Sequence, residues 1–229
     1  MTNRKIEYWV IPPETDAEFV AHMEGVLDVY AQPYDPTRPT LCMDEQPVQF
    51  QRESRPPLPA TAQHGKRIDY EYERAGTASI FMFTEPLAGW RKVSVRERRT
   101  KVDWAIEVAH ILEERYADCE KVQLVCDNLN THTKGAFYEA FPAQKAFKLA
   151  QNFEFHFTPV KASWLNMVEI ELSVLARQCL NRRIPTIEIL TSEIKQLVKE
   201  RNEVSATINW QFSISIAREK LRKHYFKNI

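Results

Sequence analysis

The order of extended and helical segments constrains the fold of this chain more than any other feature of its sequence. A short buried strand is predicted at Thr40–Glu45, and Gly76 and Gly89, near the turns between three further extended runs, predict an antiparallel meander. The largely apolar Val122–Cys126 predicts a central strand that is buried on both faces, after which helices and one more strand alternate. This order is typical of an α/β fold in which a mixed sheet carries helices on both faces. The three extended runs are Ile68–Arg74, Thr77–Glu85 and Arg91–Arg98.

Helices are predicted wherever apolar residues recur every three or four positions, and Phe153–Phe157 is a half-buried strand because three phenylalanines alternate with polar residues. The chain divides into an N-terminal extension (1–39) with one helix, an α/β domain (40–180) and a helical C-terminal tail (181–229). A long loop is expected at 54–67. The predicted helices are 14–30, which follows a short extended piece at 8–11, and then 101–116, 133–151 with a break at Pro142, 164–180, 186–202 and 213–224.

Composition excludes several classes of protein. The 229 residues are 44% hydrophobic and 27% charged, which indicates a globular protein with a core and excludes a disordered tail, a collagen-like fibre and a disulfide scaffold. The two commonest glycine-rich nucleotide-binding loops do not occur. Four cysteines stand apart with no C-x-x-C pair, which favours free thiols in a reducing compartment. The apolar stretches are too short for a membrane span, and the first residues do not resemble a secretory signal. We therefore expect a cytoplasmic protein with no membrane partner.

Two aspartates follow predicted buried strands and are the first candidates for a functional site. Asp44 comes directly after Leu41–Met43, and Asp127 comes directly after Val122–Cys126. In open α/β sheets, binding sites form outside the carboxyl ends of the strands. An acid in that position is desolvated on one side, so that it has a raised pKa or binds a cation. Either aspartate alone could instead cap a helix or a turn.

A third acid is expected on the predicted helix 164–180, where Glu169 and Glu171 compete. Asn166, Glu169 and Ser173 are spaced so that they share one polar stripe of a helix, whereas Glu171 falls among apolar residues. We therefore choose Glu169 as the ligand. Glu171 is left either to pair with an arginine or to support the site from outside the ligand set.

Three carboxylates from two strand ends and a helix suit Mg²⁺ or Mn²⁺, because these hard ions take oxygen ligands. Two such ions about 4 Å apart can hold the attacking and leaving oxygens of a phosphoryl transfer. We predict that Asp44, Asp127 and Glu169 are the metal ligands and the catalytic residues of a two-ion site. Among the histidines only His132 lies near a strand end, where it could reach a phosphate or cap a helix.

Three sequence blocks resemble a known family: DNLNTH at 127–132, FEFHFTP at 153–159 and SWLNMVEIELSV at 163–174. Together they resemble the catalytic domain of bacterial insertion-sequence transposases related to mariner elements, which belong to the DDE superfamily and have an RNase H-like fold. The resemblance extends through RPPLPA at 55–60, DYEYER at 69–74, FMFTEPLAGW at 81–90 and RQCLNRRIP at 177–185. It therefore covers most of the chain.

The resemblance assigns roles to individual residues of the α/β domain. The family's D-N-x-x-x-H block falls on Asp127, Asn128 and His132, its N-x-x-E block falls on Asn166 and Glu169, and its first acid is Asp44. It implies an Asp-Asp-Glu triad for two Mg²⁺ or Mn²⁺ ions, with Asn128, His132, Trp164 and Asn166 as supporting residues. The implied function is that of a transposase-type DNA endonuclease and strand transferase, with double-stranded DNA as substrate and target.

The chain departs from the family pattern in two ways. Forty-one residues separate Asp127 from Glu169, more than the mariner-type spacing, which predicts an extra helical segment around 138–151. Only 39 residues precede the first predicted strand, too few for the family's helix-turn-helix domains. The helix 14–30 is acidic and is expected to pack against the α/β domain or a partner chain. We therefore expect the catalytic half alone, which needs a separate or fused helix-turn-helix module, and a homodimer because transposition joins two ends.

Positive charge gathers at the C-terminal end of a chain whose net charge is zero. Residues 1–176 hold 20 basic and 26 acidic residues, whereas residues 177–229 hold 11 basic and 5 acidic ones. A basic segment beside metal-binding acids suits a partner with phosphates, and we expect a nucleoid-associated protein. A solvated basic helix with no partner is the alternative. The predicted DNA contacts are Arg177, Arg182, Arg183, Arg218, Lys220, Arg222 and Lys223.

Two other functions are consistent with parts of the sequence. An inactive transposase remnant would fold and act only as a DNA- or protein-binding module, although the presence of all three acids argues against decay of the site. A hydrolase with a carboxylate pair, such as a glycosidase, would leave the acid on the helix unexplained and lacks an obvious aromatic platform for a sugar.

Overall fold

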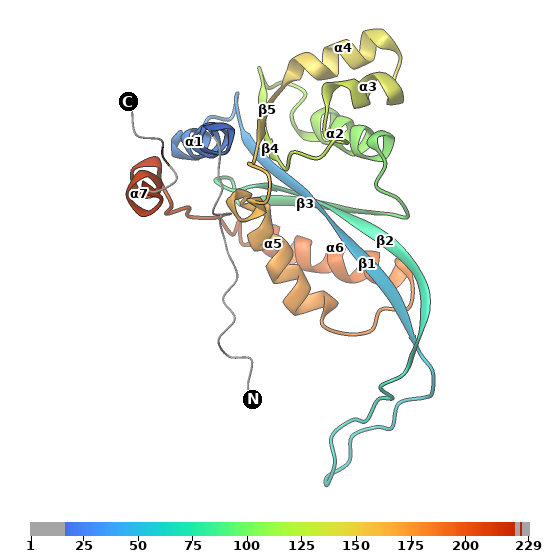
Figure 1. Ribbon diagram of the computed structural model, residues 1–229. Coiled ribbons are helices and arrows are strands. Elements are labelled where there is room, and N and C mark those ends of the chain that lie inside the picture. The colour runs from blue at the N-terminus through green and yellow to red at the C-terminus, as the bar shows by residue number, and fades with distance from the viewer. Residues whose placement is uncertain (1–16, 223–224, 226–229) are drawn as a thin grey trace.

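The computed structural model describes residues 17–222 and Tyr225, which contain a five-stranded sheet (Figure 1). The strand order is β3-β2-β1-β4-β5; β1 pairs with β2 and β2 with β3 antiparallel, whereas β1–β4 and β4–β5 are parallel. The predicted mixed α/β sheet is therefore confirmed. The extended piece at 8–11 and the first residues of the helix 14–30 lie outside the described residues. The strands are β1 (Thr40–Glu53), β2 (Tyr72–Glu85), β3 (Trp90–Arg96), β4 (Val122–Cys126) and β5 (Phe153–Phe157).

Alternate side chains of the strands bury the two faces of the sheet against different helices. Leu41 and Met43 join the cluster that contains α2 (Lys101–Arg115), α3 (Lys134–Ala140) and α4 (Ala143–Asn152). Cys42 and Val125 point to the other face, where they join the cluster of α5 (Val168–Leu175) and α6 (Ile187–Glu203). Helices on both faces of the sheet were predicted and are confirmed (Figure 1).

Local sequence explains where the helices on the first face begin and end. Thr100 caps α2, because its hydroxyl accepts the N–H of Asp103 while the Asp103 carboxylate accepts the N–H of Thr100. Pro142 stands between α3 and α4, as predicted, since proline lacks the N–H that a continuous helix requires. The extra helical segment between Asp127 and Glu169 is thus two short helices.

The N-terminal helix α1 (Ala17–Ala31) and the last helix α7 (Ile214–Lys220) pack together at one side of the sheet (Figure 1). Their buried residues include Phe19, Met23 and Leu27 of α1 and Ala217 of α7. Both oxygens of Glu24 accept hydrogen bonds at 2.7 Å from the guanidinium of Arg218. The apolar stripe of α1 therefore packs against its own chain, which is one of the two outcomes that the sequence predicts.

Two expectations about the strands are wrong. β1 continues to Glu53 instead of ending at Glu45, and β2 is one strand instead of two runs separated by a turn at Gly76. Beyond Cys42, β1 has no pairing with β4, so the missing N–H of Pro47 faces an open edge and is tolerated. Gly76 has φ of +109° and lies at a β-bulge, where the register with β1 shifts opposite Phe50.

The predicted helix 164–180 is divided into three segments. A 3-10 turn covers Ser163–Leu165, α5 begins at Val168, and a π-helical turn covers Ala176–Leu180. Asn166 lies between the first two, so the single helical stripe that was predicted to include it does not exist. Glu169 and Ser173, by contrast, both lie on α5.

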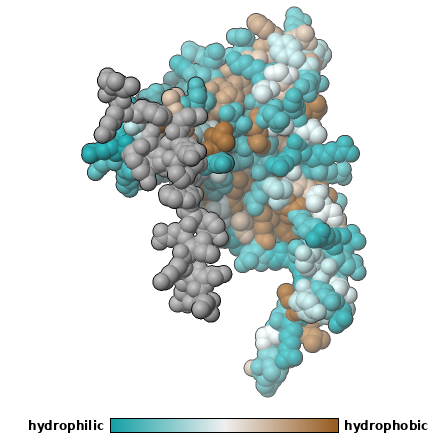
Figure 2. Space-filling model, in the orientation of Figure 1, coloured by the Kyte–Doolittle hydropathy of each residue, from teal (hydrophilic) through white to brown (hydrophobic). Residues whose placement is uncertain are grey.

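A long connection between β1 and β2 projects from the body of the molecule (Figure 1). It spans residues 54–71 and includes an isolated antiparallel bridge between Leu58 and Arg67, where a loop was predicted. Figure 2 shows it as a narrow, mainly hydrophilic projection. In the described part of the chain, none of the helices combines the length and the apolar character that a membrane crossing requires.

Candidate active site

Asp44 lies on β1, and Asp127 directly follows the neighbouring strand β4. β1 and β4 pair in parallel up to Cys42 and Val125, so Asp44 and Asp127 each come two residues after the last pair of this ladder. Adjacent strands lie about 4.8 Å apart. Because side chains alternate along a strand, Asp44 follows the direction of Cys42, which is the face covered by α5. The two acids are near enough for the charge of Asp127 to act on Asp44, although β1 runs on past Asp44 instead of ending there.

Asn166 fixes the start of α5 against β1. Its side-chain amide donates a 2.8 Å hydrogen bond to the carbonyl oxygen of Met43, the residue before Asp44. Its own carbonyl accepts the N–H of Glu169 at 3.0 Å. Asn166 is buried, so these bonds are shielded from water. One residue therefore links the strand beside Asp44 to the helix that carries Glu169.

Burial and the like charges of neighbouring acids both disfavour the ionised form of Asp44. Burial raises the pKa of Asp44 to about 7, and the negative charges of Asp127, Glu169 and Glu45 act in the same direction. The hydrogen bond from the N–H of Glu45 opposes that rise. Among the described residues, no side chain pairs with the Glu169 carboxylate. Three oxygen-bearing side chains that repel one another are a ligand set that fits a hard divalent cation.

His132 and Glu45 lie behind this group of acids. The fully buried His132 places Nε2 3.0 Å from Glu45 Oε1 and Nδ1 2.6 Å from Asp127 Oδ1. Nδ1 also lies 3.2 Å from the Asp127 carbonyl oxygen, so the contact with Oδ1 is an ion pair rather than a well-aligned hydrogen bond. Burial disfavours the charged ring, but contacts with Asp127, Cys126 and Glu45 outweigh it and raise the pKa of His132 to about 12.

Glu45 is not among the site residues predicted from the sequence. Its position directly after Asp44, on the alternate face of β1, is the signal that could have identified it. Asp44 follows Cys42 towards α5, so Glu45 follows Met43 towards α2 and the buried His132.

Glu171 has a different role from Glu169. It is buried, and its two oxygens receive four contacts of 2.8 Å from the guanidinium groups of Arg91 and Arg201. Burial raises the pKa of Glu171, but the two arginines outweigh this and hold it below its ordinary value. The predicted pairing with an arginine is confirmed, and this carboxylate is occupied by cations of the chain itself.

The other two predicted supporting residues lie in different surroundings. Asn128 is exposed, directly after Asp127. Trp164 packs with the cluster formed by α1 and α7, where its ring meets that of Phe212 edge-on at 5.6 Å. Nε1 of Trp164 is buried and has no hydrogen-bond partner among the described residues.

The predicted DNA contacts fall into two groups. Three arginines form ion pairs within the chain, and three other basic residues are exposed; Lys223 lies outside the described residues. The pairs are Arg182–Glu193, Arg183–Glu53 and Arg218–Glu24, and the exposed residues are Arg177, Lys220 and Arg222.

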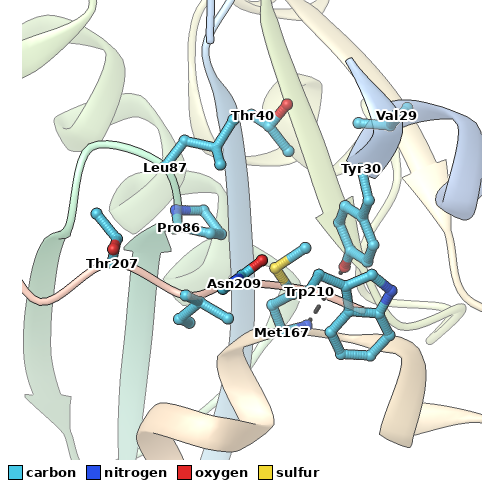
Figure 3. Close-up of a pocket in the computed structure, with 10 residues that line it drawn as sticks. Val29, Tyr30, Thr40, Pro86, Leu87, Met167, Thr207, Asn209 and Trp210 are labelled. Carbon is cyan, nitrogen blue, oxygen red and sulfur yellow. Dashed lines mark hydrogen bonds between the residues drawn. The ribbon is translucent and has the colours of Figure 1, made fainter. Parts of the chain in front are cut away.

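A cavity of about 430 Å³ opens on the same side of the sheet as α5, between α1, the β2–β3 turn and residues 207–210 (Figure 3). Tyr30, Met167 and Trp210 form part of its wall, and the hydroxyl of Tyr30 accepts the N–H of Met167 at 3.3 Å. None of the three acids lines this cavity. The acid cluster instead opens to solvent, since the Asp127 side chain is 26% exposed and Glu169 is half-buried.

The strand order β3-β2-β1-β4-β5, with helices on both faces of the sheet, defines an RNase H-like fold, in which the three acids lie on β1, directly after β4 and on α5. Residues 39–191 match the family described as DDE superfamily endonuclease. That match covers more than half of the chain and includes all three acids, so the chain belongs to the DDE superfamily endonucleases.

Solved structures with a similar fold include complexes of the Mos1 mariner transposase. The paired end complex with Mn has 13% sequence identity and a TM-score of 0.57, covering 97% of this chain and 66% of that chain. The strand transfer complex has 11% identity and a TM-score of 0.55, and the paired end complex with Mg has 11% identity and a TM-score of 0.50. Both cover 92% of this chain and 68% of theirs. This chain thus spans about two thirds of the length of those transposase chains, and no curated protein sequence matches it.

Proposed function

We propose that this chain is the catalytic half of an insertion-sequence transposase, a divalent-metal-dependent DNA endonuclease and strand transferase. The observation that carries the proposal is the group of three carboxylates from β1, the end of β4 and α5, close enough for their charges to raise the pKa of Asp44. Membership of the DDE superfamily endonucleases supports phosphodiester chemistry. Similarity to paired-end and strand-transfer complexes supports DNA as the substrate.

Asp44, Asp127 and Glu169 would hold two Mg²⁺ or Mn²⁺ ions, which would activate the attacking water or 3′-hydroxyl and stabilise charge on the phosphate oxygens. The remaining groups of the site hold these three ligands in place. The N–H of Glu45 donates to Asp44 Oδ1 at 2.7 Å, and the amide of Asn166 links the strand beside Asp44 to the helix that carries Glu169. His132 pairs with Asp127 from the buried side.

Double-stranded DNA, both element end and target, is the proposed partner. Arg177, Lys220 and Arg222 are the strongest candidates for phosphate contacts, because they are exposed and form no ion pair within the described part of the chain. Joining two ends favours a homodimer. Recognition of end sequences is assigned to a separate or fused helix-turn-helix module, since the acidic helix α1 is buried along its apolar side against this chain.

Nicking of supercoiled plasmid DNA by the purified chain in Mg²⁺ or Mn²⁺ tests the proposal. We expect metal-dependent nicking that is abolished by Asp44→Ala, Asp127→Ala or Glu169→Ala. Glu113→Gln, which removes a surface acid that pairs with Lys145, should keep full activity. A folded chain that binds DNA but never nicks it in either metal would favour the alternative, an inactive remnant that serves as a binding module.

A further inference from the structure

Residue 45 connects the two aspartates of the site. Its backbone N–H donates to Oδ1 of Asp44 at 2.7 Å, so it orients the first carboxylate directly. Its side chain crosses to the other face of the sheet, where Oε1 lies 3.0 Å from Nε2 of His132. The opposite nitrogen of that ring lies 2.6 Å from Oδ1 of Asp127. A continuous chain of contacts thus runs from Asp44 through Glu45 and His132 to Asp127.

The imidazole in this chain of contacts has no freedom to turn. His132 is fully buried, and its ring stacks on that of Trp104 at a centroid distance of 5.3 Å and an angle of 26°. Trp104 is itself fully buried in α2, which holds it against the core. Glu45 is also buried, and its second oxygen has no hydrogen-bond partner among the described residues. The ring and the acid behind it therefore form a fixed support.

Glu45, Asp127 and His132 are close enough together to be considered as a metal site in their own right. The geometry argues against that assignment. Asp127 and Glu45 approach different nitrogens of the imidazole, and these nitrogens point in diverging directions, so one ion cannot replace both contacts. The distances are those of direct ion pairs between the side chains.

We infer that Glu45 and His132 are positioning residues that fix the orientation of Asp127 for metal binding, an inference that rests on the proposed function. His132 contacts the buried Oδ1 of Asp127, so the other oxygen of this carboxylate would be the one available to an ion. Glu45 acts indirectly, through its contact with the imidazole ring of His132. Partners of this kind behind a metal ligand typically change metal affinity about 10–100-fold when they are removed.

Binding of Mn²⁺ to the purified chain, measured by the loss of the electron paramagnetic resonance signal of free Mn²⁺, tests this inference without relying on activity. Glu45→Ala and His132→Gln should each raise the Kd for Mn²⁺ about tenfold or more. Glu45→Gln retains an oxygen acceptor for Nε2 and should restore most of the affinity. Thermal unfolding and near-ultraviolet circular dichroism of each variant show that it is folded.

Glu107→Ala is the matched control, because Glu107 is another buried acid under the same face of the sheet, where it binds Ser94 and Arg96. The Glu107→Ala variant should lose stability yet keep its Mn²⁺ affinity within about twofold. If Glu45 had a merely structural role, Glu45→Ala would likewise lose stability and keep its Mn²⁺ affinity. A folded Glu45→Ala variant with the affinity of the unsubstituted chain would overturn the inference. Binding that His132→Gln abolishes but Asp44→Ala leaves intact would also overturn it, because Glu45, Asp127 and His132 would then be the ligands.

The outcome for this inference is separable from that for the proposed function. The expected Mn²⁺ pattern without any DNA nicking would support the positioning role and contradict the nuclease. If Glu45→Ala keeps both DNA nicking and the Mn²⁺ affinity of the unsubstituted chain, the nuclease would be supported and the positioning role contradicted. An unsubstituted chain that binds no Mn²⁺ would overturn both.

Discussion

Glu171 and Glu169 lie two residues apart on α5, and replacing each with glutamine should have opposite effects. Glu171 is buried between two arginines, and one of these, Arg91, is only 1% exposed. Glu169 is half-buried, and its charge faces the like charge of Asp44. Glu171→Gln should therefore destabilise the fold, whereas Glu169→Gln should abolish DNA nicking and leave the fold intact.

The size of the change in the free energy of unfolding follows from the charge that each substitution leaves without a partner. Glu171→Gln leaves the guanidinium of Arg91 buried without its counter-ion, and breaking a buried ion pair in this way typically costs about 3–5 kcal/mol. For a chain of this size, about 2–4 °C of Tm correspond to each kcal/mol, so Tm should fall by about 6–20 °C. Glu169→Gln removes one of several repelling charges, so the free energy of unfolding should change by no more than about 0.5 kcal/mol.

Urea unfolding followed by tryptophan fluorescence measures both variants in the absence of metal, and the slope of the transition shows whether unfolding remains two-state. The plasmid nicking assay is then run at a temperature at which every variant is folded. A Glu171→Gln variant that loses less than about 1 kcal/mol but no longer nicks DNA would identify Glu171 as the catalytic acid. Equal destabilisation by the two substitutions would refute the division of roles.

Three further predictions concern other parts of the chain. Gly89→Ala would place a Cβ 2.3 Å from a backbone oxygen at a residue with φ of +64°, so urea unfolding should show that the free energy of unfolding falls by more than about 1 kcal/mol. Gly25→Ala in α1 is the control, because its Cβ meets no atom within 4 Å and the substitution should be neutral or stabilising. The hydrogen bond from Arg218 lowers the pKa of Glu24, so the contribution of this pair to the docking of α7 should be present above the ordinary pKa of glutamate and be lost as pH falls through the lowered one. Smaller hydrogen-exchange protection factors in α7 at acid pH, after correction for the slower intrinsic exchange, would show this loss. Arg177→Ala should weaken DNA binding and reduce the log–log salt slope by about 0.9, and an unchanged slope would remove that residue from the DNA path.

The parts of the site that follow from local patterns could be predicted from the sequence. Apolar runs that end in an acid identify Asp44 and Asp127, and the parallel pairing of β1 with β4 leads both acids away from its last pair, although β1 itself runs on to Glu53. The choice of Glu169 over Glu171 rests on a polar stripe with Asn166 and Ser173 and on the apolar neighbours of Glu171. Asn166 lies outside α5, so that stripe is incomplete, whereas Glu171 is buried among its apolar neighbours. The identity of the two arginines that bind Glu171 could not be predicted, because Arg91 and Arg201 are distant in sequence and meet it only through tertiary packing.

Other features depend on tertiary contacts that leave weak traces in the sequence. Gly76 has the signature of a turn, yet pairing with β1 on both sides of it makes it a bulge within one long strand. Asn166 has the spacing of a helical residue, but its hydrogen bond to Met43 interrupts the helix before α5. The role of Glu45 depends on a histidine 87 positions away, and only the folded sheet brings the two together.

Anomalous diffraction from a crystal grown with Mn²⁺ tests the central claim most directly, because it locates the ion independently of activity. We predict an anomalous peak within about 2.5 Å of carboxylate oxygens of Asp44, Asp127 and Glu169, with His132 remaining on Asp127 and Glu45. A peak bound by His132 in place of Asp44, or Asp44 and Asp127 carboxylates more than about 8 Å apart with no ion between them, would contradict the proposed site.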